Sequence, residues 1–248
     1  MPSCPMGFFL YTIRPGDTLW IVAKHYHTTI YAIAAANPGI SLSNLYIGQP
    51  ICIPEEHGFS QHAHPAPDGI SKREEDLNNL LRMLWEQHVT WTRLTILSIV
   101  FDLPDAQPVT DRLLRNPEDF KSALEPLYGN MAASRFADLL TSHLVIAAQL
   151  VKAAKAGDSA AAANIGKSWY ANADEIAAFL GSINPYWSEN DWRAMLHEHL
   201  ALIKSEVVDM LNKNYKESVS VYDQIEKEAL QMADVMRNGI VRQFPNLF

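Results

Sequence analysis

The sequence has few cysteines, an excess of negative charge and no long apolar run. Its two cysteines are too few for a disulfide-rich scaffold or a four-cysteine zinc site. Lysine and arginine number 20 against 28 aspartates and glutamates, which excludes the basic face that a general nucleic-acid binder needs. No stretch reaches the roughly 18 consecutive apolar residues of a membrane span. No lysine or arginine precedes the short apolar stretch near the N-terminus, so we expect neither a membrane segment nor a secretory signal.

The chain is nevertheless long and apolar enough to bury a core. Its 248 residues are 48% hydrophobic, which predicts one or two globular domains. Residues 55–73 contain prolines, glycines and histidines without helical or strand periodicity, and this composition is typical of a linker. We therefore expect a small domain at 1–54 and a larger one at 74–248. The first is nearly neutral, so the acidity of the chain lies in the second.

The pattern of the first region predicts the order strand, helix, helix, strand. A β-type run at 10–13 ends at a Pro-Gly turn, after which Asp17 or Thr18 can cap a helix. A second helix begins near Thr28 and ends at Asn37-Pro38-Gly39, and residues 51–54 form the second strand. We expect a compact module of about 45 residues.

The motifs of this module resemble those of a LysM domain. They are Tyr11-Thr12-Ile13, Gly16-Asp17-Thr18-Leu19, Asn37-Pro38, Ile47-Gly48-Gln49 and Ile53-Pro54. The resemblance covers residues 9–54 and implies a βααβ fold that binds N-acetylglucosamine polymers, either peptidoglycan or chitin-type oligomers. It implies a shallow groove between two loops, formed here by Gly16, Asp17, Thr18, Leu19, Asn37, Pro38, Gly39 and Ile40. Helix capping and helix termination are the structural alternative for several of these residues.

The resemblance also gives the two cysteines a possible role. In a LysM fold the two strands pair antiparallel, which would bring Cys4, just before the first strand, towards Cys52 in the second. A disulfide there would suit an oxidising or extracellular setting. The alternative is a pair of reduced thiols, which would favour a cytoplasmic protein whose LysM fold binds something other than glycan.

The second region has helical periodicity throughout. Proline, glycine and asparagine breakers separate about six helices, predicted at 74–101, 109–127, 130–156, 159–183, 188–212 and 215–243. Short connections predict antiparallel neighbours and hence an all-α bundle. A stretch such as Trp169-Tyr170 followed by residues 171–177 resembles an uncharacterised helical domain of spore-forming Gram-positive bacteria. That resemblance implies the cell wall or spore surface as the location, reached without a secretory signal.

A repeat within the helical region marks candidate polar core residues. The pattern apolar, apolar, x, x, His, apolar occurs three times, and carboxylates recur on the partner helices. The histidines are His88, His143 and His199, and the carboxylates are Glu118, Asp174 and Asp234. The repeat predicts three helical hairpins, which can form either a closed bundle or a solenoid.

Two interpretations of these six residues remain open. Histidine and carboxylate ligands in a bundle core suit Zn²⁺, Fe or Mn²⁺. Alternatively, the histidines are core residues that only form hydrogen bonds. The sequence therefore favours a non-catalytic, glycan-anchored protein whose helical domain is a structural or protein-interaction module. The alternative is a LysM-targeted, metal-dependent enzyme that uses the His/carboxylate residues.

Overall fold

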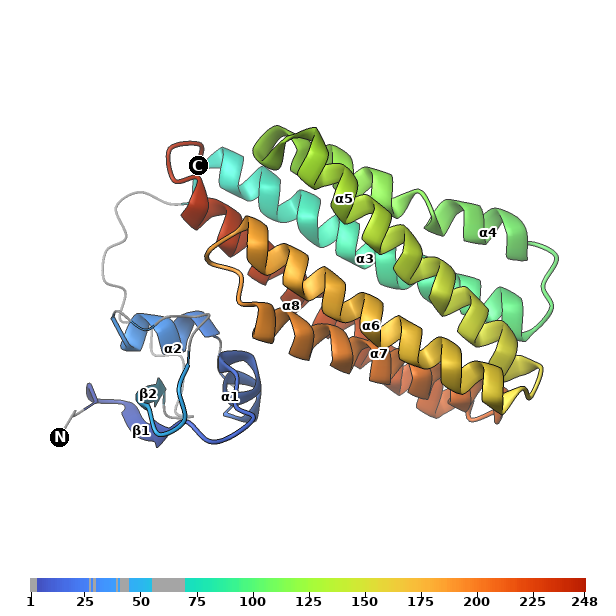
Figure 1. The fold of residues 1–248 in the computed structure, drawn as a ribbon, viewed down its shortest axis with the longest axis horizontal. Helices are drawn as coiled ribbons and strands as arrows, with labels where there is room; N and C mark the ends of the chain where they lie inside the picture. The colour runs from blue at the N-terminus through green and yellow to red at the C-terminus, as the bar shows by residue number, and fades with distance from the viewer. Residues whose placement is uncertain (1–3, 27, 29, 39, 41–44, 55–69) are drawn as a thin grey trace.

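The computed structural model describes residues 4–26, 28, 30–38, 40, 45–54 and 70–248. Most of the predicted linker, residues 55–69, lies outside the described residues. The described chain forms a small α/β module followed by a larger helical bundle (Figure 1). The predicted two-part fold class is confirmed.

The N-terminal module has the predicted order of elements: β1 (Phe8–Thr12), α1 (Leu19–His25), α2 (Ile30–Ala36) and β2 (Pro50–Pro54). The two strands pair antiparallel, with Leu10 opposite Cys52. Helix α2 packs on β2 and α1 packs on α2, and their apolar side chains, including the fully buried Leu19 and Ile33, form the core of the module. Cys4 and Cys52 form a disulfide bond with a Cα–Cα distance of 5.5 Å, as the resemblance implied. The bond fastens the segment before β1 to the second strand.

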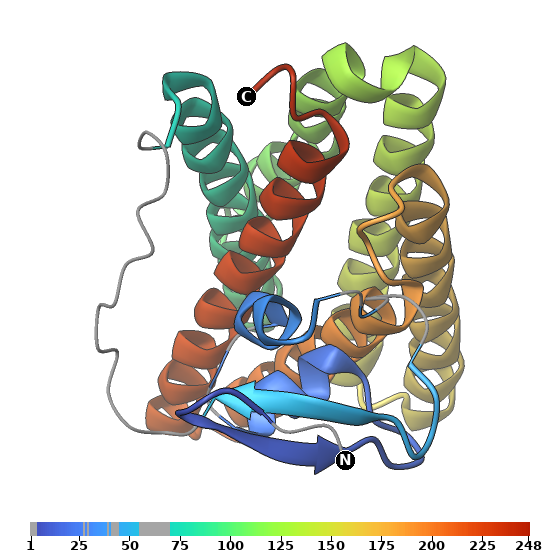
Figure 2. The ribbon, with the colours of Figure 1, turned by 90° about the vertical axis from the view of Figure 1, so that its left-hand side faces the viewer.

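The helical bundle consists of antiparallel helices joined by short turns. They are α3 (Lys72–Val100), α4 (Ala106–Leu113), α5 (Asn116–Lys155), α6 (Ser159–Ile183), α7 (Glu189–Leu211) and α8 (Tyr215–Gln243). The last helix, α8, packs against the first, α3, as well as against α7 (Figure 2). This contact closes the three predicted hairpins into a bundle, so the solenoid alternative is excluded.

Most predicted helix boundaries agree with the structure to within a few residues. The predicted break at Gly129 is a kink inside α5, where this glycine has a φ of +77° that few other residues adopt. The single helix predicted at 109–127 is wrong, because the structure divides it between α4 and the first part of α5. Pro117, in the first turn of α5, explains the division: proline lacks the N–H that a continuous helix would need there.

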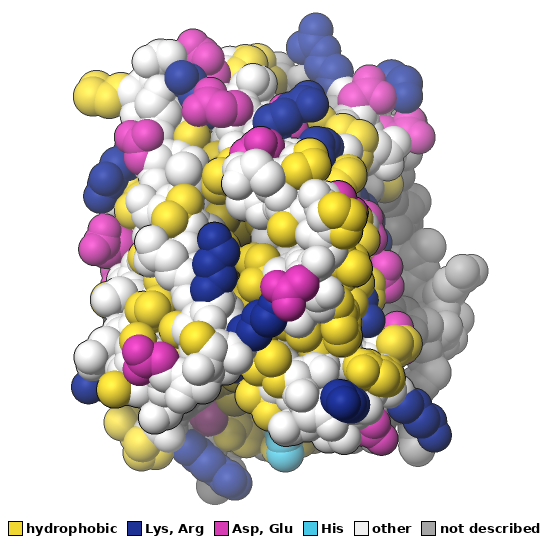
Figure 3. Space-filling model, turned by 90° about the vertical axis from the view of Figure 1, so that its right-hand side faces the viewer, with side chains coloured by type: hydrophobic (Ala, Val, Ile, Leu, Met, Phe, Trp, Pro, Cys, Tyr) yellow, Lys and Arg dark blue, Asp and Glu magenta, His cyan; other side chains and the backbone are white. Residues whose placement is uncertain are grey.

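The interior of the bundle is rich in aromatic side chains. Trp85 and Trp192 stack with ring centroids 6.3 Å apart, and Trp187 meets Trp192 edge to face at 6.1 Å. The stretch Ala106–Lys155 has the length and hydropathy of a membrane span, but 44% of its most apolar window is buried inside the bundle. At the end of the bundle seen in Figure 3, charged side chains of both signs lie among apolar ones.

The N-terminal module is docked on the side of the bundle (Figures 1 and 2). Helix α1 contacts α7, and Lys24 of α1 forms an ion pair with Glu198 of α7. A cavity of about 400 Å³ lies on one side of this contact, between the module and helices α3 and α8. The side chains of Arg82 and Asp234 in its wall are joined at 2.7 Å.

Candidate functional site

The loop between β1 and α1 is held in shape by its own hydrogen bonds. The Asp17 carboxylate accepts from the Tyr11 hydroxyl at 2.7 Å and from the backbone N–H of Arg14 at 2.7 Å. Burial, and next the bond to Asp17, raise the pKa of Tyr11 to about 12, so this hydroxyl remains a donor. Gly16 provides the turn with a φ of +88°, and Thr18 caps α1 by accepting a backbone N–H. The predicted capping role of Thr18 is confirmed.

Two of the residues predicted to contact sugar have structural roles in the module. The Asn37 side chain donates to the carbonyl oxygens of Ile33 and Cys52 at 2.6 and 2.8 Å, and it accepts the Cys52 N–H at 2.7 Å. Its amide group therefore ties α2 to β2. Leu19 is fully buried, so its side chain cannot contact a ligand at the surface.

A cavity of about 450 Å³ opens between the β1–α1 loop and the helical bundle. Its volume falls within the ~300–1,000 Å³ range of small-molecule sites. The module lines it with Ile13, Arg14, Gly16, Asp17, Thr18, Leu45 and Ile47, and α7 lines it with Asn190, Arg193, Ala194 and His197. The cavity therefore belongs to both parts of the chain.

The structure brings three of the predicted glycan-contact residues to this cavity. They are Gly16, Asp17 and Thr18. In the second predicted loop, Pro38 is exposed and Ile40 is half-buried, and neither lines the cavity. Gly39 lies outside the described residues.

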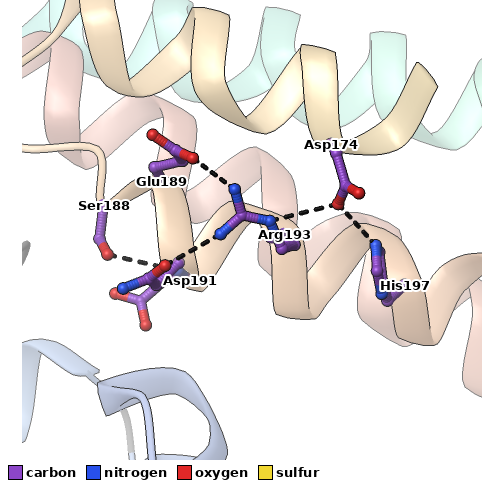
Figure 4. Close-up of polar contacts among 7 residues, drawn as sticks. Asp174, Ser188, Glu189, Asp191, Arg193 and His197 are labelled. Atoms are coloured by element: carbon purple, nitrogen blue, oxygen red, sulfur yellow. Dashed lines mark hydrogen bonds and ion pairs between the residues drawn. The ribbon is translucent and has the colours of Figure 1, made fainter. Parts of the chain in front are cut away.

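A polar network fixes the wall that α7 contributes (Figure 4). Asp174 of α6 accepts hydrogen bonds from Arg193 Nε at 3.2 Å and from His197 Nε2 at 2.8 Å. Arg193 also pairs with Glu189 and donates to the Asn190 side-chain oxygen at 3.0 Å. Two carboxylates thus compensate the charge of Arg193. The cavity wall combines polar groups with little uncompensated charge.

The N-terminal fold and its loop define a small βααβ binding module beside a larger helical domain. Residues 11–54 match the family model of the LysM domain, so this part of the chain is a LysM domain. The match indicates binding of glycans that contain N-acetylglucosamine, and LysM domains typically act at the cell wall. No curated protein and no solved structure matches the chain.

The three repeated histidines lie in the bundle core, each with a partner on the next helix segment of its hairpin. His88 Nδ1 lies 3.1 Å from the Asn116 side-chain oxygen, and His143 Nδ1 lies 2.8 Å from that of Asn172. Each asparagine also donates to a backbone carbonyl one turn before the histidine, at Leu84 and Leu139 respectively. In the third hairpin, His199 Nδ1 lies 3.1 Å from Glu228 Oε2. The three predicted histidines therefore occupy corresponding positions in the cores of the three hairpins.

The predicted grouping of these histidines with Glu118, Asp174 and Asp234 is not present. Glu118 is exposed, Asp174 bonds Arg193 and His197, and Asp234 pairs with Arg82 at 2.7 Å. Among the residues that the structure describes, no group of three or more His, Cys, Asp or Glu side chains could hold a metal ion. The enzyme alternative thus loses the site on which it depended.

Burial controls the charge of the groups inside the bundle. It lowers the pKa of His88 and His143 to about 3 and that of His199 to about 4, so all three are uncharged at neutral pH. Burial raises the pKa of Glu228 well above its usual value. It also raises that of Glu206 to about 7, although Arg93 pairs with this carboxylate and acts in the opposite direction.

Sequence reasoning missed the partners of the histidines and the wall of the cavity. A usable signal existed for the partners, since Asn116, Asn172 and Glu228 follow their histidines at a separation of 28 or 29 residues. No sequence signal joins Asn190 or His197 to a loop in another domain.

Proposed function

We propose that the LysM domain binds an uncharged glycan containing N-acetylglucosamine, of the peptidoglycan or chitin type, at the loop Arg14–Thr18. The helical domain is the structural or protein-interaction module that this binding anchors. One observation carries the proposal: the loop that belongs to the LysM match borders a cavity of ligand size, about 450 Å³.

The chemistry of the cavity supports a sugar ligand. Asp17 and Thr18 offer polar groups on a loop that is already held in place, and Ile47, 68% exposed, offers an apolar surface beside them. A sugar ring presents hydroxyl and acetamide groups at its edge and C–H groups on its faces, so it can use both kinds of surface. Because the loop is preorganised, little conformational entropy is lost when it binds.

The disulfide of the LysM domain supports a location at the cell wall. The Cys4–Cys52 disulfide fits an oxidising environment outside the cytoplasm. A single LysM domain presents one small site, so repeated glycan units and several protein copies would increase its avidity. The spore surface remains a prediction that rests on the sequence resemblance alone.

Two glycine variants test the proposed site. Gly16 and Gly7 have φ values of +88° and +85°, and an added Cβ would meet nothing within 4 Å at either position. Alanine at either position therefore introduces a similar strain of about 1–2 kcal/mol without a clash. Gly16 lies in the proposed binding loop and Gly7 precedes β1.

Binding is measured on the full chain by calorimetry with N-acetylglucosamine hexamers, and glucose hexamers serve as the ligand control. We expect the N-acetylated oligomer alone to bind. Gly16→Ala should weaken it several-fold, and Gly7→Ala should leave it unchanged. Absence of binding to both the hexamer and insoluble peptidoglycan would overturn the proposal.

A further inference from the structure

The glycan cavity has a second wall that does not belong to the LysM domain. Its inner side is the loop Arg14–Thr18, and its opposite side is the first part of α7, where Asn190, Ala194 and His197 line it. The LysM domain is held against this helix by the contact between α1 and α7 and by the Lys24–Glu198 ion pair. A ligand in the cavity would touch both domains at once.

The side chains of this wall have unused hydrogen-bonding capacity. Asn190 is exposed, and its side-chain oxygen accepts from Arg193 at 3.0 Å, which leaves its amide hydrogens without a partner among the described residues. His197 uses Nε2 for Asp174 at 2.8 Å, and no described residue bonds its Nδ1. The Asn190 amide can donate to a sugar hydroxyl or an acetamide oxygen, and His197 Nδ1, an acceptor when Nε2 carries the proton, can accept from a sugar hydroxyl.

The wall is also built to stay in place. Arg193 and His197 both bond Asp174, which projects from the neighbouring helix α6 (Figure 4). Glu189, one turn before Arg193, forms an ion pair with the Arg193 guanidinium. Because the carboxylates compensate the guanidinium, the wall favours an uncharged sugar over an anionic one. Asp174 is thus a positioning residue for the cavity wall.

We propose that the helical domain forms part of the glycan site, with Asn190 and His197 on α7 contacting the N-acetylglucosamine chain that the LysM loop holds. This inference rests on the proposed glycan binding of the LysM domain. The bundle is then one wall of the binding site as well as the module that the LysM domain anchors. Full affinity for the glycan requires the contact between the two domains.

Two substitutions on α7 test this wall without altering the LysM domain. Asn190→Ala removes the exposed amide, and loss of one hydrogen bond should lower the affinity for the hexamer about fivefold. Its control, Asn164→Ala, removes an exposed asparagine of α6 that does not line the cavity. Ala194→Trp fills the cavity from the helical side and should lower the affinity at least tenfold. Its control is Ala201→Trp, at an exposed position on the same helix.

The outcomes separate the two proposals. If the wild-type chain binds the hexamer and both α7 variants bind it equally well, the LysM loop acts alone and the inference is overturned while the proposed function stands. If Asn190→Ala weakens binding and Asn164→Ala does not, the helical wall takes part, even where Ala194→Trp proves unable to fold. If the wild-type chain binds no N-acetylated glycan, both proposals fail.

Discussion

Acidification should destabilise the bundle because its three core histidines are held uncharged. Burial lowers the pKa of each from 6.5 to about 3 or 4. Below pH 6.5 the unfolded chain therefore binds protons that the folded chain does not bind. Stability therefore falls as the pH falls through this window. The magnitude is about 1.4 kcal/mol per pH unit for each histidine.

Two buried glutamates act in the opposite sense. Glu206 and Glu228 have pKa values raised above 4.5 by burial, so their folded forms hold protons that the unfolded chain releases above pH 4.5. Their stabilising effect grows as the pH falls from 6.5 to 4.5 and then stops growing. Between pH 6.5 and 4.5 the three histidines outweigh the glutamates, because each carboxylate can offset at most one proton, so at least about 2 kcal/mol of the free energy of unfolding should be lost, against a typical domain's ~5–15 kcal/mol. Below pH 4.5 the loss should continue at about 2 kcal/mol per pH unit, because the glutamates stop contributing while His199, with a pKa of about 4, begins to titrate in the folded chain.

The variant His143→Gln isolates one of these titrations. It removes one proton from the difference between the folded and unfolded chains, so from pH 6.5 to 4.5 its free energy of unfolding should fall less steeply than that of the wild type, by about 1.4 kcal/mol per pH unit. Its stability at pH 7 should be lower by about 1–3 kcal/mol, because the imidazole packs against Trp169 with ring centroids 5.3 Å apart.

The assay is urea unfolding followed by far-UV circular dichroism at a series of pH values. His25→Gln, which removes an exposed imidazole of the LysM domain, is the matched control and should keep the wild-type slope. A wild-type slope in His143→Gln would refute the reasoning, since His143 would then titrate alike in the folded and unfolded chains.

Two further substitutions or treatments address packing and the disulfide. Gly239→Ala should destabilise the bundle by about 1–3 kcal/mol despite the ~1 kcal/mol gain in helix propensity, because the new Cβ would overlap the fully buried indole of Trp187; a higher midpoint in urea would contradict this. The LysM disulfide joins cysteines that are 48 residues apart in sequence, so its reduction should remove about 4 kcal/mol of stabilisation from loop closure. The melting temperature of the LysM domain should fall, and hexamer binding should weaken. An unchanged melting profile in reductant would show that the strands and helices alone hold the domain.

The local sequence determined most of the secondary structure. Apolar residues repeat with helical periodicity from Glu74 onward, and a helix forms from contacts between residues three and four apart, so its presence can be read from a short window. Glycine at 129 predicted a break because its backbone reaches conformations that other residues avoid. The LysM motifs were recognisable for a similar reason, since the turns at Gly16 and Asn37 require those residue types within a few positions.

The partners of the core histidines could not be read in the same way. A shift of four residues is about one helical turn and leaves the same side of a helix facing inward. In the third hairpin the sequence repeat pointed to Asp234, whereas the partner is Glu228, six residues earlier and four residues before the position that corresponds to Asn116 and Asn172. In the first two hairpins the true partners, Asn116 and Asn172, lay two positions before the predicted carboxylates. Only packing of one helix on another selects the residue that meets the histidine.

By itself, the sequence determined a LysM domain, a helical bundle and the polar residues that repeat along it. The tertiary structure decided that the bundle is closed, that its histidines pair with amides and a glutamate, and that the LysM loop faces α7 across a shared cavity. These features depend on contacts between segments far apart in the chain, such as the ion pair of Lys24 and Glu198. Their meeting is set by how complete elements pack together, which no local pattern of residues records.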